Sequence, residues 1–174
     1  MHADYGALVE IANRDLLFRF QAPQIAPHIH NDWRANKQKQ KKHFRYDLPF
    51  DKLPDWLQEE NVAAAERISR ILALVSLRIA PEDRDAEDQL ESVQRILEQH
   101  LELLAEEEHD GWVDYKLQDG WQLGPRDDDN RRHDGLIPYR ELPDSVRQYD
   151  RNSVLMYPEV VKRSGFRIVP VGMK

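Results

Sequence analysis

Two tryptophans each stand three positions after a histidine: Trp33 follows His30, and Trp112 follows His109. An aromatic side chain can stack on a nucleotide base, with a gain of ~1–3 kcal/mol per base. Tryptophan in a helix is also a common core residue, so two interpretations stay open for each ring, ligand stacking and plain packing. If the two segments are related, their rings would suit a planar ligand held between them.

A second group of candidates lies in the turn-rich segment 120–127, with the sequence Gly-Trp-Gln-Leu-Gly-Pro-Arg-Asp. Its glycines permit a tight hook, and Trp121 can hold that hook against the core. Arg126 can pair with an acid or bind a phosphate with its planar fork. Asp127 closes the segment. Arg131, Arg132 and His133 would add positive charge next to this hook. The alternative is that their loop is simply solvated.

Glu108 interrupts an apolar stripe that runs in steps of three and four residues from Leu90 to Tyr115. A carboxylate there must be paired or face a pocket, unless the helix has already emerged into water. His109 points about 100° away from Glu108 on a helix, so we expect it to bond a backbone carbonyl or a loop aspartate rather than to form an acid–base pair. Tyr139 either lines the pocket or packs in the core.

Bulk properties exclude several classes of protein. The chain has 174 residues, 40% of them apolar, with a net charge of −7 and no cysteine. This composition argues against general DNA or RNA binding, disulfides and thiolate metal sites, and no apolar run reaches the ~20 residues that span a bilayer. We therefore expect a cytoplasmic protein. The basic stretch 34–45 is either a solvated helix end or an anion-binding face.

Neither metal binding nor catalysis is expected. His28 and His30 are two apart, but no third ligand has convincing spacing. No phosphate loop, nucleophile elbow, zinc-protease motif or dinucleotide fingerprint occurs. We predict no cofactor and no enzymatic activity.

Hydrophobic periodicity and turn residues predict a mostly α-helical fold. Helices are expected over 4–20, 27–42, 55–76, 86–117 and 144–164, the first ended by prolines at 23 and 27 and the last interrupted near Pro158. Residues 80–87 are expected to form a linker, and 166–171 a short strand after Gly165.

The chain also shows an internal repeat. Phe50-x-x-Leu-Pro-Asp matches Tyr139-x-x-Leu-Pro-Asp at an offset of 89 residues, and the same offset pairs Arg78-Ile79 with Arg167-Ile168. The two His-x-x-Trp motifs are 79 residues apart, so the hook would be a ten-residue insertion in the second copy. We predict two helix-pair repeats, residues 1–85 and 86–174, related by a pseudo-twofold axis, with short strands, and packed as one globular unit because neither alone buries much surface.

The second copy resembles the ryanodine-receptor repeat, or RyR domain. The similar positions run in order over about 90–169: Ala105-Glu-Glu-Glu-His109-Asp-Gly-Trp112, Gly120-Trp121-x-x-Gly124-Pro125-Arg126-Asp127, His133, Leu136-Ile-Pro-Tyr139-x-x-Leu142-Pro143, Tyr149-Asp150-Arg151 and Arg163-x-Gly165-Phe-x-Ile168. The first half resembles a degenerate copy without the hook. The tandem arrangement is similar to that of RyR domains in bacteria and phages.

The resemblance implies a helical regulatory module whose tryptophans are associated with adenine nucleotides. We therefore expect a non-enzymatic protein that binds a small nucleotide, or a cyclic or ADP-ribose-type signal, between its repeats, as a sensor with a separate effector protein or as a sequestering protein. The alternative is a protein–protein interaction or structural module without a small-molecule ligand. The expected ligand-binding residues are Trp33, Glu108, His109, Trp112, Trp121, Arg126, Asp127, His133 and Tyr139.

Overall fold

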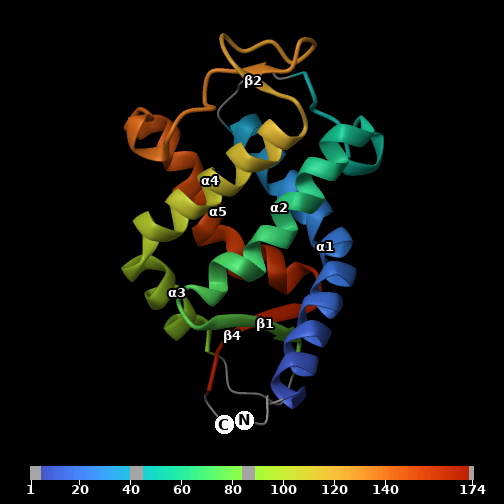
Figure 1. Ribbon diagram of the computed structural model, residues 1–174, viewed down its shortest axis with the longest axis vertical. Coiled ribbons are helices and arrows are strands. Elements are labelled where there is room, and N and C mark those ends of the chain that lie inside the picture. Colours follow the sequence, from blue (N-terminus) through green and yellow to red (C-terminus); the bar gives the residue numbers. More distant parts are fainter. Residues whose placement is uncertain (1–4, 40–44, 84–88, 173–174) are drawn as a thin grey trace. The chain divides into compact units, whose positions relative to one another are not determined.

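The computed structural model (Figure 1) describes residues 5–39, 45–83 and 89–172, with side chains from residue 21 onward. The protein is mostly α-helical with a few short strands, as the sequence predicts. It divides into two compact units, residues 1–69 and 70–174. The division falls inside a helix, whereas the predicted boundary at residue 85 follows the sequence repeat, so the repeat boundaries stay a prediction.

The first unit is built on one long helix, α1 (Tyr5–Lys39). The predicted break at Pro23 and Pro27 is wrong, because both prolines lie inside α1. Each proline removes one backbone hydrogen bond, while Ala22, Ile25 and Ala26 between and beside them are fully buried. Burial of this apolar face offsets the lost bonds, so the helix continues. A 3-10 turn, η1 (Phe50–Lys52), and α2 (Asp55–Ala73) follow.

The second unit contains two helices where the sequence predicts one. Helix α3 (Leu90–Gln99) ends at His100, and α4 (Leu101–Gln118) begins directly after it. The backbone of His100 leaves the helical region, with φ −111° and ψ 18°. The predicted single helix over 86–117 is therefore wrong, and no glycine or proline at the break signals it. Val93 and Leu97 on α3 and Leu104 on α4 are buried, as the apolar stripe predicts.

The last helix, α5 (Asp144–Arg163), runs through Pro158 without the predicted interruption. Buried Val154, Tyr157 and Val161 flank the proline on the side that packs inward. The packing of these side chains outweighs the single lost hydrogen bond. A second 3-10 turn, η2 (Tyr139–Glu141), precedes α5, and α4 and α5 lie side by side in Figure 1.

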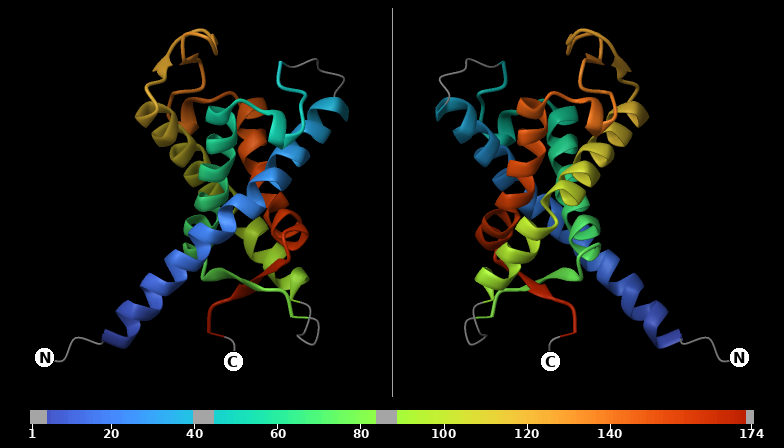
Figure 2. Two further views of the ribbon diagram at one scale, coloured as in Figure 1. Left: turned by 90° about the vertical axis from the view of Figure 1, so that its right-hand side faces the viewer. Right: turned by 90° about the vertical axis from the view of Figure 1, so that its left-hand side faces the viewer.

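Two small sheets complete the second unit. Strands β1 (Leu77–Pro81) and β4 (Phe166–Pro170) pair antiparallel, with Ile79 opposite Ile168 at the centre of the register. The start of the predicted linker thus belongs to a strand, and its residues 84–87 lie outside the part of the chain that the structure describes. The hook after α4 carries β2 (Gln122–Leu123) and β3 (Arg132–His133), which pair in parallel. Figure 2 shows the hook projecting beyond the C-terminal end of α4.

Segments 89 residues apart have the same local structure. Both 3-10 turns follow a proline, and in each the third residue donates its N–H to that proline's carbonyl at 2.9 Å, from Lys52 to Pro49 and from Glu141 to Pro138. Leu53 and Leu142 after these turns are equally buried, and α2 and α5 begin at the aspartates of the two Leu-Pro-Asp motifs. The two strands that pair with each other, β1 and β4, also occupy equivalent positions. These matches agree with the sequence repeat, although the ancestry and the twofold arrangement stay predictions.

Within the described residues, no helix is long and apolar enough to cross a membrane.

Candidate functional site

Helix α4 carries an acid, an aromatic ring and a cation at four-residue steps: Glu108, Trp112 and Lys116. Residues four apart lie on one face of a helix, so an acid, a ring and a cation follow one another along α4. We call these three residues the α4 stripe. A ligand could donate a hydrogen bond to Glu108, stack a planar group on Trp112 and place an anionic group near Lys116.

Glu108 begins the stripe and is only 8% exposed. The Tyr157 hydroxyl of α5 donates a hydrogen bond of 2.6 Å to its Oε2 atom. The helix has therefore not emerged into water at this point, and the interpretation that Glu108 is paired is correct. The bond fixes the carboxylate at the junction of α4 and α5.

His109 is buried beside the stripe and has a structural role. Its Nε2 donates to the backbone carbonyl of Ile137 at 2.8 Å, which confirms the predicted carbonyl partner. Asp150 Oδ2 lies 3.7 Å from the other ring nitrogen, Nδ1. The imidazole thereby ties α4 to the segment before η2, and its ring lies 5.6 Å from that of Trp112.

Trp112 is half-buried, and His133 of the hook packs against it edge to face, with ring centroids 4.9 Å apart. The N–H of Gly135 donates to His133 Nδ1 at 2.9 Å. Since Nδ1 accepts this bond, the neutral ring carries its proton on Nε2. A Cβ atom on Gly135 would lie 3.1 Å from the His133 ring, so glycine allows the close approach that holds this imidazole against the indole.

The hook is fixed to α4 by Trp121, which is 4% exposed. Lys116 Nζ lies 3.8 Å from the centroid of its ring, within cation–π distance, and the indole Nε1 donates to Asp119 at 3.2 Å. Arg131 closes the hook by donating to the side chain of Asp119 at 3.2 Å. The prediction that Trp121 holds the hook to the core is confirmed, and Lys116 joins the hook to the stripe.

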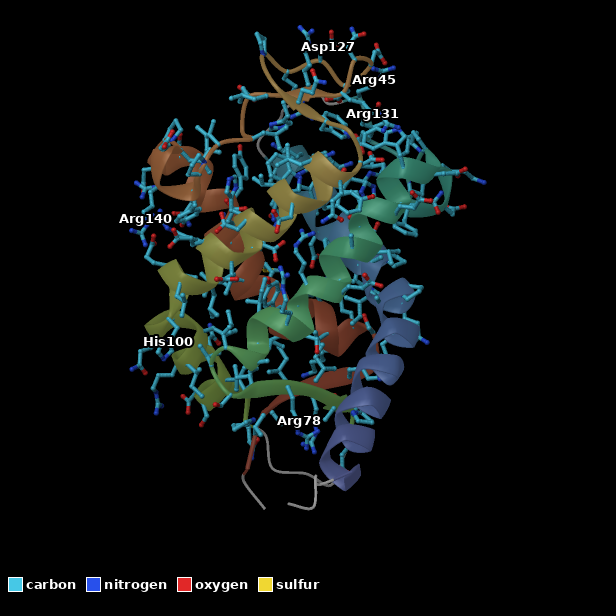
Figure 3. All side chains as sticks on the ribbon, in the orientation of Figure 1. Arg45, Arg78, His100, Asp127, Arg131 and Arg140 are labelled. Carbon is cyan, nitrogen blue, oxygen red and sulfur yellow. The ribbon has the colours of Figure 1, made fainter. Side chains whose placement is uncertain are left out.

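The tip of the hook is polar and exposed. Arg126 has a 62% exposed side chain and forms an ion pair of 3.2 Å with Asp128. Asp127 accepts hydrogen bonds from the backbone and the side chain of Asn130, which lower its pKa. Asp127 and Arg131 are labelled on the hook in Figure 3. Asp127 thus stabilises the turn, whereas Arg126 reaches into solvent.

The environment of His133 shows which charges surround the Trp112 ring. Burial lowers the pKa of His133 most, and the nearby cations Arg126 and Lys116 lower it further, while Asp134 and Asp128 oppose them. The imidazole of His133 therefore packs on the half-buried indole of Trp112, and the charges of Arg126 and Lys116 both act on it. Such a group can receive a planar ring with an attached anion.

Residues 88–170 match the family model described as RyR domain. We call residues 88–170 the RyR domain, after the family model that they match. The matched segment includes the whole α4 stripe, the hook and η2, so the predicted resemblance is confirmed over this part of the chain. The first half lies outside the match, and its status as a degenerate copy stays a prediction.

Tyr139 of the RyR domain is a packing residue. It is buried with Ala105 and Leu142 in one cluster, as the packing interpretation holds, and its ring lies 6.0 Å from that of His109. Its hydroxyl donates to Glu102 at 3.3 Å. Glu102 also pairs with Arg151, which lowers the carboxyl pKa. Tyr139 therefore supports the site through His109.

Trp33 belongs to the first unit, and its sequence position is outside the matched segment. The residue is 40% exposed, and its ring stacks on that of His30 with centroids 6.0 Å apart. His30 Nε2 donates to the carbonyl of Leu48 at 2.7 Å, and Lys37 Nζ lies 5.6 Å from the Trp33 ring. The sharing of one ligand by Trp33 and Trp112 stays a prediction.

The structure brings five of the predicted site residues together through ring contacts and neighbouring positions on α4. They are Glu108, His109, Trp112, His133 and Tyr139. Lys116 is the residue that the sequence analysis missed. A signal was present, because each tryptophan of the two His-x-x-Trp motifs has a lysine four positions later, Lys37 and Lys116. Among the side chains that the structure describes, no group of three or more metal-ligating residues occurs.

Proposed function

We propose that the RyR domain of this protein is a non-enzymatic module that binds a small nucleotide or a nucleotide-derived signal, as a sensor or a sequestering protein. The observation that carries the proposal is the α4 stripe, where Glu108, Trp112 and Lys116 lie in line beside His133. The base would stack on Trp112, and Glu108 would accept a hydrogen bond from the sugar or from an exocyclic amine. Lys116 and Arg126 would bind the phosphate, with His133 donating through Nε2.

Two contacts favour binding over catalysis at this site. His109 is occupied by the Ile137 carbonyl, and Glu108 receives the Tyr157 hydroxyl. These bonds give both titratable groups a fixed structural position on adjacent sides of α4. An acid–base pair would require the two groups to converge on one reacting atom.

Isothermal titration with AMP, ADP, a cyclic nucleotide and ADP-ribose tests the proposal. We expect at least one of these compounds to bind, and Trp112→Ala to abolish the binding while circular dichroism shows unchanged helicity. Trp112→Phe, which keeps an aromatic face, should retain part of the affinity. Tyr149→Ala removes an exposed aromatic ring of the same domain and should have no effect. Silence across the panel would reject the proposal and favour a protein–protein interaction module.

Trp33 is a candidate for the same ligand, which is a prediction from the sequence repeat. Trp33→Ala tests this assignment in the same titration. A sensing role would further need a separate effector protein, whereas sequestration needs only tight binding.

A further inference from the structure

The first half of the chain repeats the contacts that position Trp112. His30 and His109 each donate through Nε2 to the carbonyl of the residue before a proline, Leu48 at 2.7 Å and Ile137 at 2.8 Å. The ring of each histidine also lies close to its tryptophan, at 6.0 Å in the first half and 5.6 Å in the second. Each indole is thus held at the end of a helix by the same histidine bridge.

The aromatic residue behind each histidine is also matched. Phe50 lies 6.4 Å from His30 between ring centroids, and Tyr139 lies 6.0 Å from His109. The lysine four positions after each tryptophan completes the correspondence, and Lys37 Nζ is 5.6 Å from the Trp33 ring. The ring and the cation that the proposed function uses in the RyR domain are therefore both present in the first half.

Lys37 and Arg34 lie on the same helix but make different contacts, because Lys37 lies near the Trp33 ring and Arg34 pairs with Asp47. Arg34 and Gln38 both bond Asp47, which ties that face of α1 to the segment before η1. Lys37 lies on the Trp33 side, and Lys39 adds a further positive charge in the last turn. Cations near the C-terminal end of α1 are also favoured by the helix dipole, so this end of α1 presents a ring beside positive charge.

We propose that the first half carries a second ligand site, built on Trp33 and Lys37, for a planar ring that bears an anionic group such as a phosphate. The inference rests on the proposed function for its ligand class, but it assigns a separate ligand to Trp33. The two sites should differ in strength, because Ile29 occupies the position of Glu108 and offers no carboxylate to a ligand.

This difference in polar groups predicts two classes of binding. The RyR domain site should prefer a base with an exocyclic amine, which Glu108 can accept. The Trp33 site should not distinguish bases by an exocyclic amine, and should bind about tenfold more weakly because the hydrogen bond to a carboxylate is missing.

Fluorine NMR of the full chain labelled with 5-fluorotryptophan separates the two sites, since each of the four tryptophans gives its own signal. The signals are assigned by single Trp→Phe variants, and ADP and inosine diphosphate are the probes. We expect the Trp112 signal to shift first and more readily with ADP. The Trp33 signal should shift at higher concentration, equally with both compounds, and should still do so in the Trp112→Ala variant.

Lys37→Gln provides the matched test, with Arg34→Gln as its control on the same helix. We expect Lys37→Gln to weaken the Trp33 response about tenfold and to leave the Trp112 response unchanged, and Arg34→Gln to have a smaller effect on ligand binding. A Trp33 signal that never moves would overturn the second site. A common midpoint for both rings, with the Trp33 response lost in Trp112→Ala, would overturn it in favour of one shared ligand. Failure of the proposed function has a different signature, a Trp112 signal that does not move.

Discussion

The His30–Trp33 half and the His109–Trp112 half use one backbone scaffold with different polar groups. In both, a histidine bridges to the residue before a proline, a 3-10 turn follows, and a helix starts at an aspartate. The second half places the polar pair Glu108 and Tyr157 where the first has Ile29 and Ile68. The scaffold therefore forms in the first half without this polar pair, so the pair is a feature of the second half alone.

The largest expected effect concerns this polar pair. Tyr157→Phe removes the 2.6 Å hydrogen bond to buried Glu108, and loss of a partner from a buried polar group costs ~1–3 kcal/mol. Chemical denaturation should show that decrease in the free energy of unfolding. Tyr139→Phe is the matched control, because its hydroxyl makes a longer bond of 3.3 Å to Glu102 and Phe50 stands at the equivalent position. Equal losses in the two variants would contradict the contrast between the halves.

A smaller effect on folding stability is expected from the residues that directly precede strands β1 and β4. Ser76 before β1 has a positive φ of 56°, while Gly165, at the equivalent position before β4, has φ 81°. A left-handed backbone costs a residue with a Cβ atom about 1–2 kcal/mol, whereas glycine adopts it freely. Ser76→Gly should therefore raise the melting temperature, and Gly165→Ser should lower it. Changes of the same sign in both variants would show that other contacts decide stability here.

The third prediction concerns the folding stability at acidic pH. Burial lowers the pKa of both His30 and His133 below 6.5 in the folded protein. The unfolded chain therefore binds more protons as the pH falls below about 6.5, and folding stability decreases through that range. Unfolding measured between pH 7.5 and 5 should show this decrease.

Two variants divide the acid effect between the halves. His30→Gln keeps a donor for the Leu48 carbonyl, and His133→Asn keeps an acceptor for the Gly135 N–H. Each should remove part of the pH dependence. A pH profile that neither variant changes would assign the acid sensitivity to other groups.

The sequence predicted what depends on local pattern and left out what depends on packing. The repeat offsets paired the two Leu-Pro-Asp segments and the strands at 77–81 and 166–170, and a carbonyl partner was predicted for His109. The 3-10 turns and the bond of His30 to the Leu48 carbonyl were not predicted. The helix ends predicted from the prolines at 23, 27 and 158 were wrong, because burial of Ile25 and of Val154 offsets the lost backbone hydrogen bonds. Local sequence rules do not include the free energy of that burial. The break at His100 had no signal in residue type. At the site, Lys116 was missed because its contact with Trp121 exists only once the hook folds back.

The pairing of β1 with β4 has a consequence for synthesis of the chain. Residue 79 meets residue 168, so nearly 90 further residues must leave the ribosome before the first strand can find its partner. Contacts of such long sequence separation form late and slow folding. Until then β1 is an unpaired edge open to other chains. The nascent protein should accordingly be most prone to aggregation after β1 has left the ribosome and before β4 has followed it. Truncation before residue 166 should leave the edge of β1 permanently exposed.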